Sequence, residues 1–448
     1  MIDALDLAAR VRAREVSPRE LADEAAARIE RTNATLNFLV TGAEFAPPED
    51  GPFRGVPMLV KDLTETAGIR TTFSSRAFAG YVPAADAGIV RRMRAAGFTI
   101  LGKSNTPEFG VTAVTESELN GACRNPWDTA RTPGGSSGGA AAAVAAGVVP
   151  LAHGSDGGGS IRIPASCCGL FGLKPSRGRV SPAPYVSGSL ELSQSAGISA
   201  TVRDAAAFLD VLAGYEPGDA HWPPPPERPF LDEVGREPGR LRIAFTVEPP
   251  IPVPVDPAVA AVARATAARL EGLGHQVEEA TPPWRDDALL GWFERMWQLT
   301  PALYPVRDPA LLTPLNRALL ERAHATSSVE LAQAVAALQR HARRVVEFWA
   351  HVDIVLTPTL AKLPVPVGWV FDPGDPWEQF ARGAEFSPFT PIANVTGQPA
   401  ASVPAGLVDG LPVGVQLIGP PNGEALLFRL AAQLEAAFPW ELSPAAAR

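Results

Sequence analysis

Short apolar runs of strand length alternate with longer stretches of helical spacing along most of the chain. The spacing predicts helices over residues 3–14, 17–31, 87–96 and 138–146, and strands over residues 56–60, 98–101 and 148–152. Ser17 and Pro18 form a typical helix start, because serine caps free backbone N–H groups and proline fits the first helical position. Strands that alternate with helices in this way predict a layered α/β fold.

The pattern changes at about Tyr215, where a stiff, proline-rich loop begins. We expect residues 210–345 to form a variable, mainly helical region that shapes a substrate site. The further predicted elements are strands over residues 241–246, 353–358 and 411–419, a helix over 256–274, and aromatic-rich helices within 284–350. The sequence contains no internal repeat, and we predict a single domain over residues 1–448.

The composition argues against several classes of protein. The chain has 448 residues, a net charge of −9 at pH 7 and a pI near 5.3, which argues against a nucleic-acid or anionic-membrane surface. Three cysteines, two of them adjacent, fit neither a disulfide framework nor a zinc site. The N-terminus lacks the apolar segment of a signal peptide, and the run 140–152 is too short to span a bilayer. We expect a soluble cytoplasmic protein without metal or cofactor.

Lysine is rare among the basic residues. Of 39 lysines and arginines only four are lysines, namely Lys61, Lys103, Lys174 and Lys362. Arginine cannot lose its proton in a protein, so a lysine kept in this background suggests a task that requires proton release. Lys61 follows the apolar run 56–60 and is the strongest candidate; the alternative is an ordinary surface lysine.

Two glycine-rich segments, 134–139 and 154–164, contain the candidate serines Ser136 and Ser160. Glycine permits the backbone angles that let N–H groups converge on one point, so Gly157, Gly158 and Gly159 could form an oxyanion hole beside Ser160. Ser160 is therefore the better nucleophile candidate. A plain turn is the alternative, whereas a phosphate-binding loop is disfavoured because neither usual phosphate-loop pattern is matched.

Histidine is a poor candidate for the catalytic base. Of the six histidines only His153 lies near the glycine segments, and it is expected to end a buried strand. A neutral Lys61 could accept a proton if burial lowers its pKa. Ser136 could then act as a relay between Lys61 and Ser160. Asp156 could orient the surrounding backbone or serve only as a turn residue.

The motifs together identify the chain as resembling the amidase signature family. They lie at residues 55–57, 61–62, 102–105, 108–109, 134–139, 154–164, 169–175 and 396–400. The resemblance spans most of the chain and is weakest over about 210–345. It implies a Ser–cis-Ser–Lys triad of Ser160, Ser136 and Lys61, with a non-proline cis peptide bond before Ser136. It also implies a large mixed β-sheet wrapped by α-helices on both faces.

One position departs from the commonest pattern of this family. Gly157 stands where threonine is frequent, which we expect to loosen the oxyanion loop or to admit a bulkier acyl group. The sequence around Ser160 resembles free-standing amidases of the aryl-acylamidase, cyclic-oligoamide-hydrolase and urethanase type. It resembles the glutaminase subunit of tRNA-dependent amidotransferases less closely.

Aromatic side chains are the candidate walls of the substrate pocket. We single out Trp127, Tyr185 and Trp297, and the further candidates are Trp292, Phe293, Tyr304, Phe371, Trp377, Phe380 and Phe386. Such walls suit apolar or aryl groups. Arg162 fits a structural role as well as a substrate-binding one. The predicted substrates are uncharged small-molecule amides, with carbamates and esters as further possibilities, hydrolysed by a monomer or homodimer. A glutaminase subunit and a non-catalytic binding protein are the alternatives.

Overall fold

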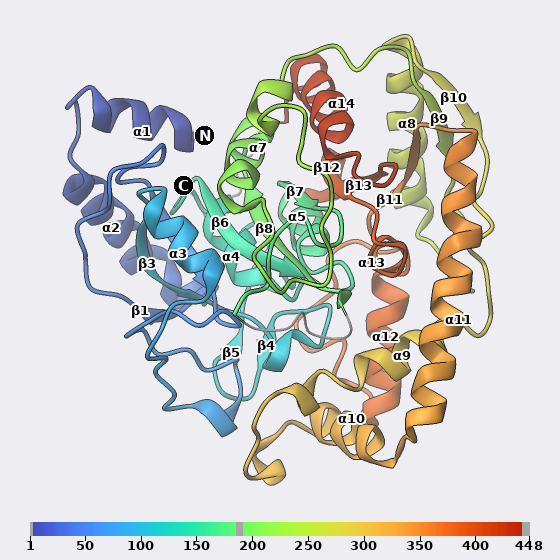
Figure 1. The fold of residues 1–448 in the computed structure, drawn as a ribbon, viewed down its shortest axis with the longest axis horizontal. Helices are drawn as coiled ribbons and strands as arrows, with labels where there is room; N and C mark the ends of the chain where they lie inside the picture. Colours follow the sequence, from blue (N-terminus) through green and yellow to red (C-terminus); the bar gives the residue numbers. More distant parts are fainter. Residues whose placement is uncertain (1–2, 185–190, 441–448) are drawn as a thin grey trace.

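The computed structural model describes residues 3–184 and 191–440. Its centre is an eight-stranded mixed sheet in the order β10-β9-β11-β13-β12-β7-β8-β6 (Figure 1). The strands are β6 (Leu151–Asp156), β7 (Phe171–Lys174), β8 (Gln194–Ser199), β9 (Arg242–Phe245), β10 (Gln276–Glu279), β11 (Ile354–Pro358), β12 (Ala400–Val408) and β13 (Leu411–Ile418). β9 runs parallel to both β10 and β11, and the remaining pairs are antiparallel.

Helices cover both faces of this sheet, as predicted. The described helices are α1 (Ala4–Arg12), α2 (Pro18–Leu36), α3 (Gly88–Ala95), α4 (Gly138–Ala145), α5 (Arg162–Cys168), α7 (Val202–Leu212), α8 (Pro257–Gly272), α9 (Leu289–Trp297), α10 (Pro314–Ala325), α11 (Ser328–Val346), α12 (Pro376–Phe386), α13 (Pro391–Thr396) and α14 (Glu424–Ala437). Alternate residues of β11 enter different cores: Ile354 and Leu356 pack with α7, α8 and α14, whereas Val355 packs with α9, α11 and α13. This period of two is what a sheet buried on both faces requires.

A smaller sheet brings the lysine-bearing strand into the interior. Its order is β1 (Leu39–Gly42), β3 (Thr99–Ser104) and β2 (Pro57–Lys61), with β2 parallel to β3. All five residues of β2 are buried. A short hairpin, β4 (Glu116–Ser117) and β5 (Gly121–Ala122), lies in the same half of the chain. The predicted strand over residues 56–60 is therefore confirmed, with Lys61 as its last residue.

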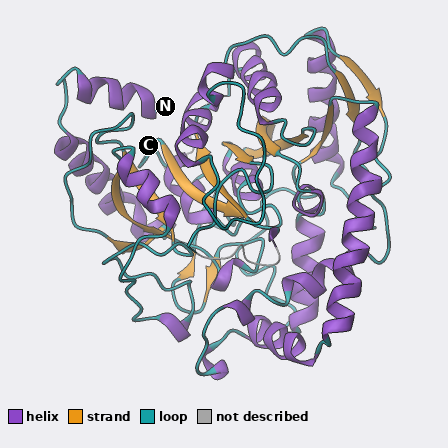
Figure 2. Ribbon diagram, viewed as in Figure 1, coloured by secondary structure: helices purple, strands orange, loops and turns teal. Residues whose placement is uncertain are grey.

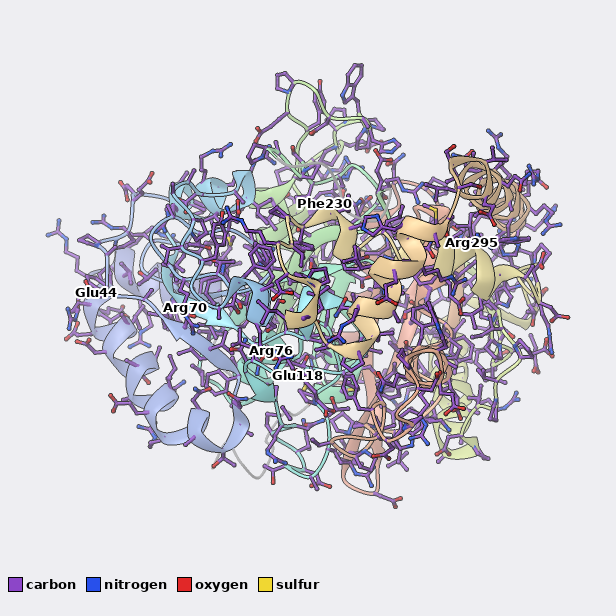
Figure 3. The ribbon with its side chains drawn as sticks, turned by 90° about the horizontal axis from the view of Figure 1, so that it is seen from below. Glu44, Arg70, Arg76, Glu118, Phe230 and Arg295 are labelled. Atoms are coloured by element: carbon purple, nitrogen blue, oxygen red, sulfur yellow. The ribbon has the colours of Figure 1, made fainter. Side chains whose placement is uncertain are left out.

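Helices lie on both sides of the molecule, with α1, α2 and α3 on one side and α8 and α11 on the other (Figure 1). The long helix α11 runs along one edge, with α12 inward of it (Figure 2). In the view of Figure 3, Arg70 of the N-terminal part and Arg295 of α9 lie on opposite sides, with Arg76 and Glu118 between them. Arg76 and Glu118 form an ion pair at 2.8 Å. No helix among residues 3–184 and 191–440 is both long enough and apolar enough to cross a bilayer.

One predicted boundary is wrong in an informative way. The strand expected over residues 148–152 runs instead over Leu151–Asp156, paired with β8. Val148 and Val149 are buried in the turn between α4 and β6 and do not belong to the strand. An apolar pattern misses this end of β6 because His153, Ser155 and Asp156 are polar. Their side chains hydrogen-bond in the interior, His153 and Ser155 to Lys61 and Asp156 to Arg162.

Candidate active site

Lys61 ends β2 with its amine inside a group of serine oxygens. Its Nζ donates to Ser136 Oγ at 2.8 Å, to Ser155 Oγ at 3.1 Å and to the Ser155 carbonyl at 3.2 Å. The side chain is fully buried. Burial lowers the pKa of Lys61 to about 7, although attraction to Asp156 opposes the shift. The structure thus places an amine that can be neutral near pH 7 against the hydroxyl of Ser136.

Two other lysines share this burial without the same contacts. Burial also lowers the pKa of Lys103 and of Lys174 to about 7. Lys103 donates to the Thr64 carbonyl and to Thr66 Oγ1, and Lys174 donates to the Pro175 carbonyl. Three of the four lysines are therefore buried, whereas Lys362 is half-buried and forms an ion pair with Glu385 at 2.9 Å. Among the buried three, only contact with a serine hydroxyl that faces a cavity distinguishes Lys61.

A backbone hydrogen bond next to Ser136 holds the segments that carry Ser136 and Ser160 together. The Gly135–Ser136 peptide bond is cis, as the family resemblance implied, and α4 begins two residues later. The Ser137 N–H donates to the Ser160 carbonyl at 3.2 Å, and both Ser136 and Ser160 line one cavity. Among the described residues the two hydroxyls make no hydrogen bond to each other. Hydrogen bonds between catalytic groups are often long in the absence of substrate and shorten in the complex with substrate.

A buried ion pair fixes the glycine turn that carries Ser160. Asp156 Oδ1 accepts from Gly159 N–H at 2.7 Å, and the Asp156 carboxylate also binds the Arg162 guanidinium at 2.8 Å. The Arg162 guanidinium also donates hydrogen bonds to the Thr390 carbonyl and to Gln416 Oε1. Burial alone would raise the pKa of Asp156, but Arg162 outweighs it and holds the pKa below its ordinary value. Arg162 thus has a structural role here.

The same contacts correct the predicted oxyanion hole. Because Gly159 N–H already donates to Asp156, it is not free to meet an oxyanion. Gly159 has a φ of +128°, and a Cβ there would collide with the Thr390 hydroxyl, so this position requires glycine for packing. Gly157 and Gly158 each line a cavity beside Ser160, and their N–H groups have no acceptor among the described residues.

His153 is not placed to act as a base. It is fully buried, and its Nδ1 accepts from the Lys61 backbone N–H at 3.4 Å. Burial and the nearby Lys61 and Lys103 amines lower the pKa of His153 to about 3. The imidazole is therefore neutral, and its role is structural: it accepts a hydrogen bond from the backbone of strand β2.

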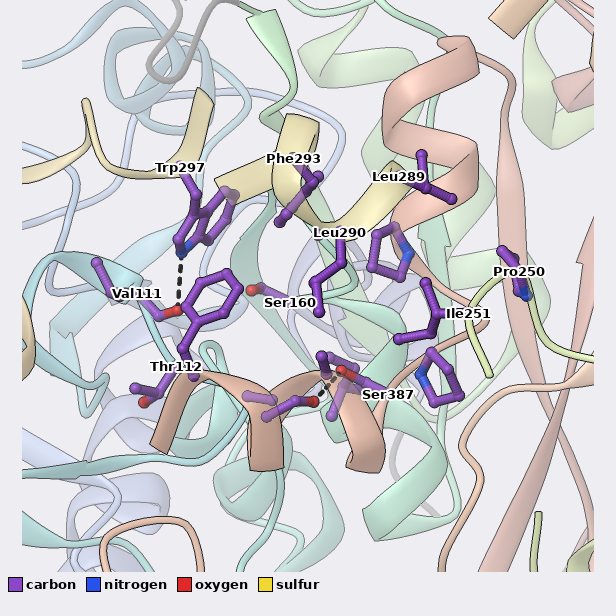
Figure 4. Close-up of a pocket in the computed structure, with 18 of the residues that line it drawn as sticks. Val111, Thr112, Ser160, Pro250, Ile251, Leu289, Leu290, Phe293, Trp297 and Ser387 are labelled. Atoms are coloured by element: carbon purple, nitrogen blue, oxygen red, sulfur yellow. Dashed lines mark hydrogen bonds between the residues drawn. The ribbon is translucent and has the colours of Figure 1, made fainter. Parts of the chain in front are cut away.

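Of the three predicted substrate-binding aromatics, Trp297 lies beside Ser160. Its indole N–H donates to the Val111 carbonyl at 3.0 Å, and the ring stacks on Phe293 with centroids 5.1 Å apart (Figure 4). Trp127 lies elsewhere: its indole N–H donates to the Cys168 carbonyl, and it lines neither cavity that contains Ser160. Tyr185 lies outside the described residues.

A family model described as Amidase matches residues 26–428. The chain belongs to the amidase signature family. It is 40% identical to a 6-aminohexanoate-cyclic-dimer hydrolase of Paenarthrobacter ureafaciens, over 98% of this chain and 95% of that protein. A solved 6-aminohexanoate cyclic dimer hydrolase complexed with substrate matches with a TM-score of 0.94 at 35% identity, over 100% of this chain and 99% of that one. A bacterial aryl acylamidase matches with a TM-score of 0.84 at 28% identity, over 98% and 96%.

This amidase is a hydrolase of amide C–N bonds, as the sequence predicted. The likeness extends through residues 210–345, where the motif resemblance is weakest, because the structural match covers the full chain. Of the further aromatic candidates, Phe293, Tyr304 and Phe380 line the two cavities, whereas Trp292, Phe371, Trp377 and Phe386 do not. Other walls, which the sequence did not single out, come from residues 111–113, 250–251, 383–384 and 387–395. These segments carry apolar side chains that periodicity alone cannot distinguish from core.

Proposed function

We propose that this amidase hydrolyses uncharged, apolar or aryl small-molecule amides through an acyl-enzyme intermediate on Ser160. The observation that carries the proposal is the 2.8 Å contact between the buried Lys61 amine and Ser136 Oγ. An amine with a pKa near neutrality can take a proton from a hydroxyl, whereas a surface lysine stays charged.

The proton follows one path in both directions. Neutral Lys61 takes the proton of Ser136, and Ser136 takes the proton of Ser160 as Ser160 Oγ bonds to the substrate carbonyl carbon. The Gly157 and Gly158 N–H groups stabilise the oxyanion. When the C–N bond breaks, Ser136 returns a proton to the departing nitrogen and recovers one from Lys61. Water then attacks the ester by the same relay, releasing the carboxylic acid and regenerating Ser160.

A serine-directed fluorophosphonate tests the nucleophile. We expect one covalent adduct, on Ser160, because the reagent requires an activated serine beside an oxyanion hole. Trypsin releases Ser136 and Ser160 in one peptide, residues 132–162, so fragment ions must localise the added mass. The Ser160→Ala variant is the control and should remain unlabelled. Labelling of Ser136 in the native amidase would reverse the two roles.

The charges around Ser160 support uncharged substrates. Among the described residues that line the two cavities, no lysine, arginine or histidine occurs, and Glu65 is the one charged side chain. Its carboxylate accepts from the Tyr81 hydroxyl at 2.5 Å. A substrate carboxylate would therefore lose its hydration without gaining a cation. The same reasoning disfavours glutamine, whose free carboxylate would also lack a cationic partner in these cavities.

A panel of matched substrates tests this preference. We expect neutral acyl p-nitroanilides to be hydrolysed with a kcat/KM at least about tenfold above that of analogues carrying a terminal carboxylate, the scale of one lost charge-pairing interaction. Carbamates and esters with the same acyl and leaving groups belong in the panel, because the same tetrahedral chemistry serves them. Glutamine should release no ammonia. A preference for the carboxylate-bearing substrates would overturn the proposed substrate class.

A further inference from the structure

Ser160 lies where two cavities of very different size meet. The smaller has a volume of about 90 Å³ and the larger about 610 Å³. Ser160 and Trp297 are the two described residues that line both. An amide bond attacked by Ser160 therefore has a separate space for each of its substituents.

The proton relay decides which substituent occupies which cavity. The nitrogen of the breaking C–N bond must reach Ser136, because that hydroxyl returns the proton. Ser136 and Ser155 line the larger cavity and are absent from the lining of the smaller one. Building on the proposed function, we infer that the larger cavity binds the leaving amine and that the smaller cavity binds the acyl group.

The smaller cavity sets narrow limits on that acyl group. Its described lining has no charged residue, and its polar side chains are Thr112, Ser160, Gln379 and Ser387. A volume of about 90 Å³ corresponds to about three water-sized groups, at the roughly 30 Å³ that one water occupies in the liquid. The structure thus assigns this amidase to short, apolar acyl groups joined to larger amines. The larger cavity is of the size that proteins use for whole small molecules.

Trp297 forms the partition between the cavities. Its ring is fixed by the bond to Val111 and by stacking on Phe293. A Cβ at Gly157 would lie 3.1 Å from Trp297 Cη2, so the indole already fills the space that a side chain at 157 would need. The absence of a side chain at Gly157 therefore makes room for the partition. This argues against one of the two effects expected from the sequence, a bulkier acyl group, and leaves the other, a looser oxyanion loop, as a prediction.

Two cavity-filling variants test the assignment. Ala384 of α12 lines only the smaller cavity, and Ser195 of β8 lines only the larger. Two substrate series are compared: acetyl, butanoyl and hexanoyl p-nitroanilides, and butanamides with N-methyl to N-octyl leaving groups. Ala384→Leu should lower kcat/KM for hexanoyl relative to acetyl at least about tenfold and leave the N-alkyl ratios within about twofold. Ser195→Leu should show the opposite pattern, and Trp297→Ala should extend the acyl length accepted.

The outcomes separate this assignment from the triad. Fluorophosphonate titration counts functional sites, so loss of folded enzyme does not distort the ratios. If Ala384→Leu penalises the N-alkyl series, the two cavities have the opposite roles and the assignment is overturned. If neither variant changes either ratio, the cavities do not bind the substituents. Failure of the triad itself would be seen separately, as turnover that survives Ser160→Ala.

Discussion

Replacing Ser160 with alanine is expected to lower kcat on a chromogenic anilide by about 10⁶-fold, the scale found for removing the nucleophile of a serine protease. Without Ser160 Oγ no ester can form, and Ser136 and Lys61 have no proton to move. The oxyanion donors and the binding cavities remain, so a small residual rate over water is expected. The measurement is kcat at saturating substrate, with circular dichroism to confirm the fold.

Ser166→Ala is a matched control for this variant. Ser166 lies six residues further on, is buried in α5, and accepts a hydrogen bond from the Gly414 N–H at 3.0 Å. Removing that hydroxyl should cost about 1 kcal/mol of unfolding free energy and leave kcat nearly unchanged. If Ser160→Ala kept more than about one hundredth of the native kcat while Ser166→Ala behaved as described, Ser160 would not be the nucleophile.

The positions of the candidate residues were predictable from the sequence because they lie in short motifs. Ser136 and Ser160 each stand among glycines, and Lys61 follows an apolar run of strand length. Each of these signals concerns neighbours along the chain. The sequence could not show that Asp156 takes the Gly159 N–H, because that contact depends on the turn geometry that Arg162 fixes from within α5.

The cavity walls were less predictable because distant segments build them. Trp127 and Trp297 are both aromatic residues that the sequence offers equally as pocket walls. In the structure the Trp127 indole N–H donates to the Cys168 carbonyl, away from the cavities, whereas the Trp297 indole N–H donates to the Val111 carbonyl beside Ser160. Residues 111–113, 289–297 and 379–395 meet only in the folded chain. An apolar side chain that lines a cavity and one that fills a core have the same pattern, so tertiary packing decides between them.

The second large effect that we expect is a loss of activity when Lys61 is protonated at low pH or replaced. The base is the neutral amine, and burial lowers the pKa of Lys61 to about 7. Activity should therefore be present above that pH and lost as pH falls through about 7, in a kcat/KM profile measured from pH 5 to 9. Lys61→Arg keeps the cation but cannot lose its proton, so kcat/KM should fall by about 10²- to 10⁴-fold at every pH.

Lys174→Met is the control that separates base function from burial. Burial lowers the pKa of Lys174 to about 7 as well, but its amine donates to the Pro175 carbonyl and reaches no serine hydroxyl. In Lys174→Met, kcat/KM should still fall as the pH drops below about 7, with the same midpoint. In Lys61→Arg, kcat/KM should be low at every pH and show no such fall. If this fall moved with Lys174 and not with Lys61, the titrating base would be a different amine, and the path from Lys61 through Ser136 to Ser160 would be wrong.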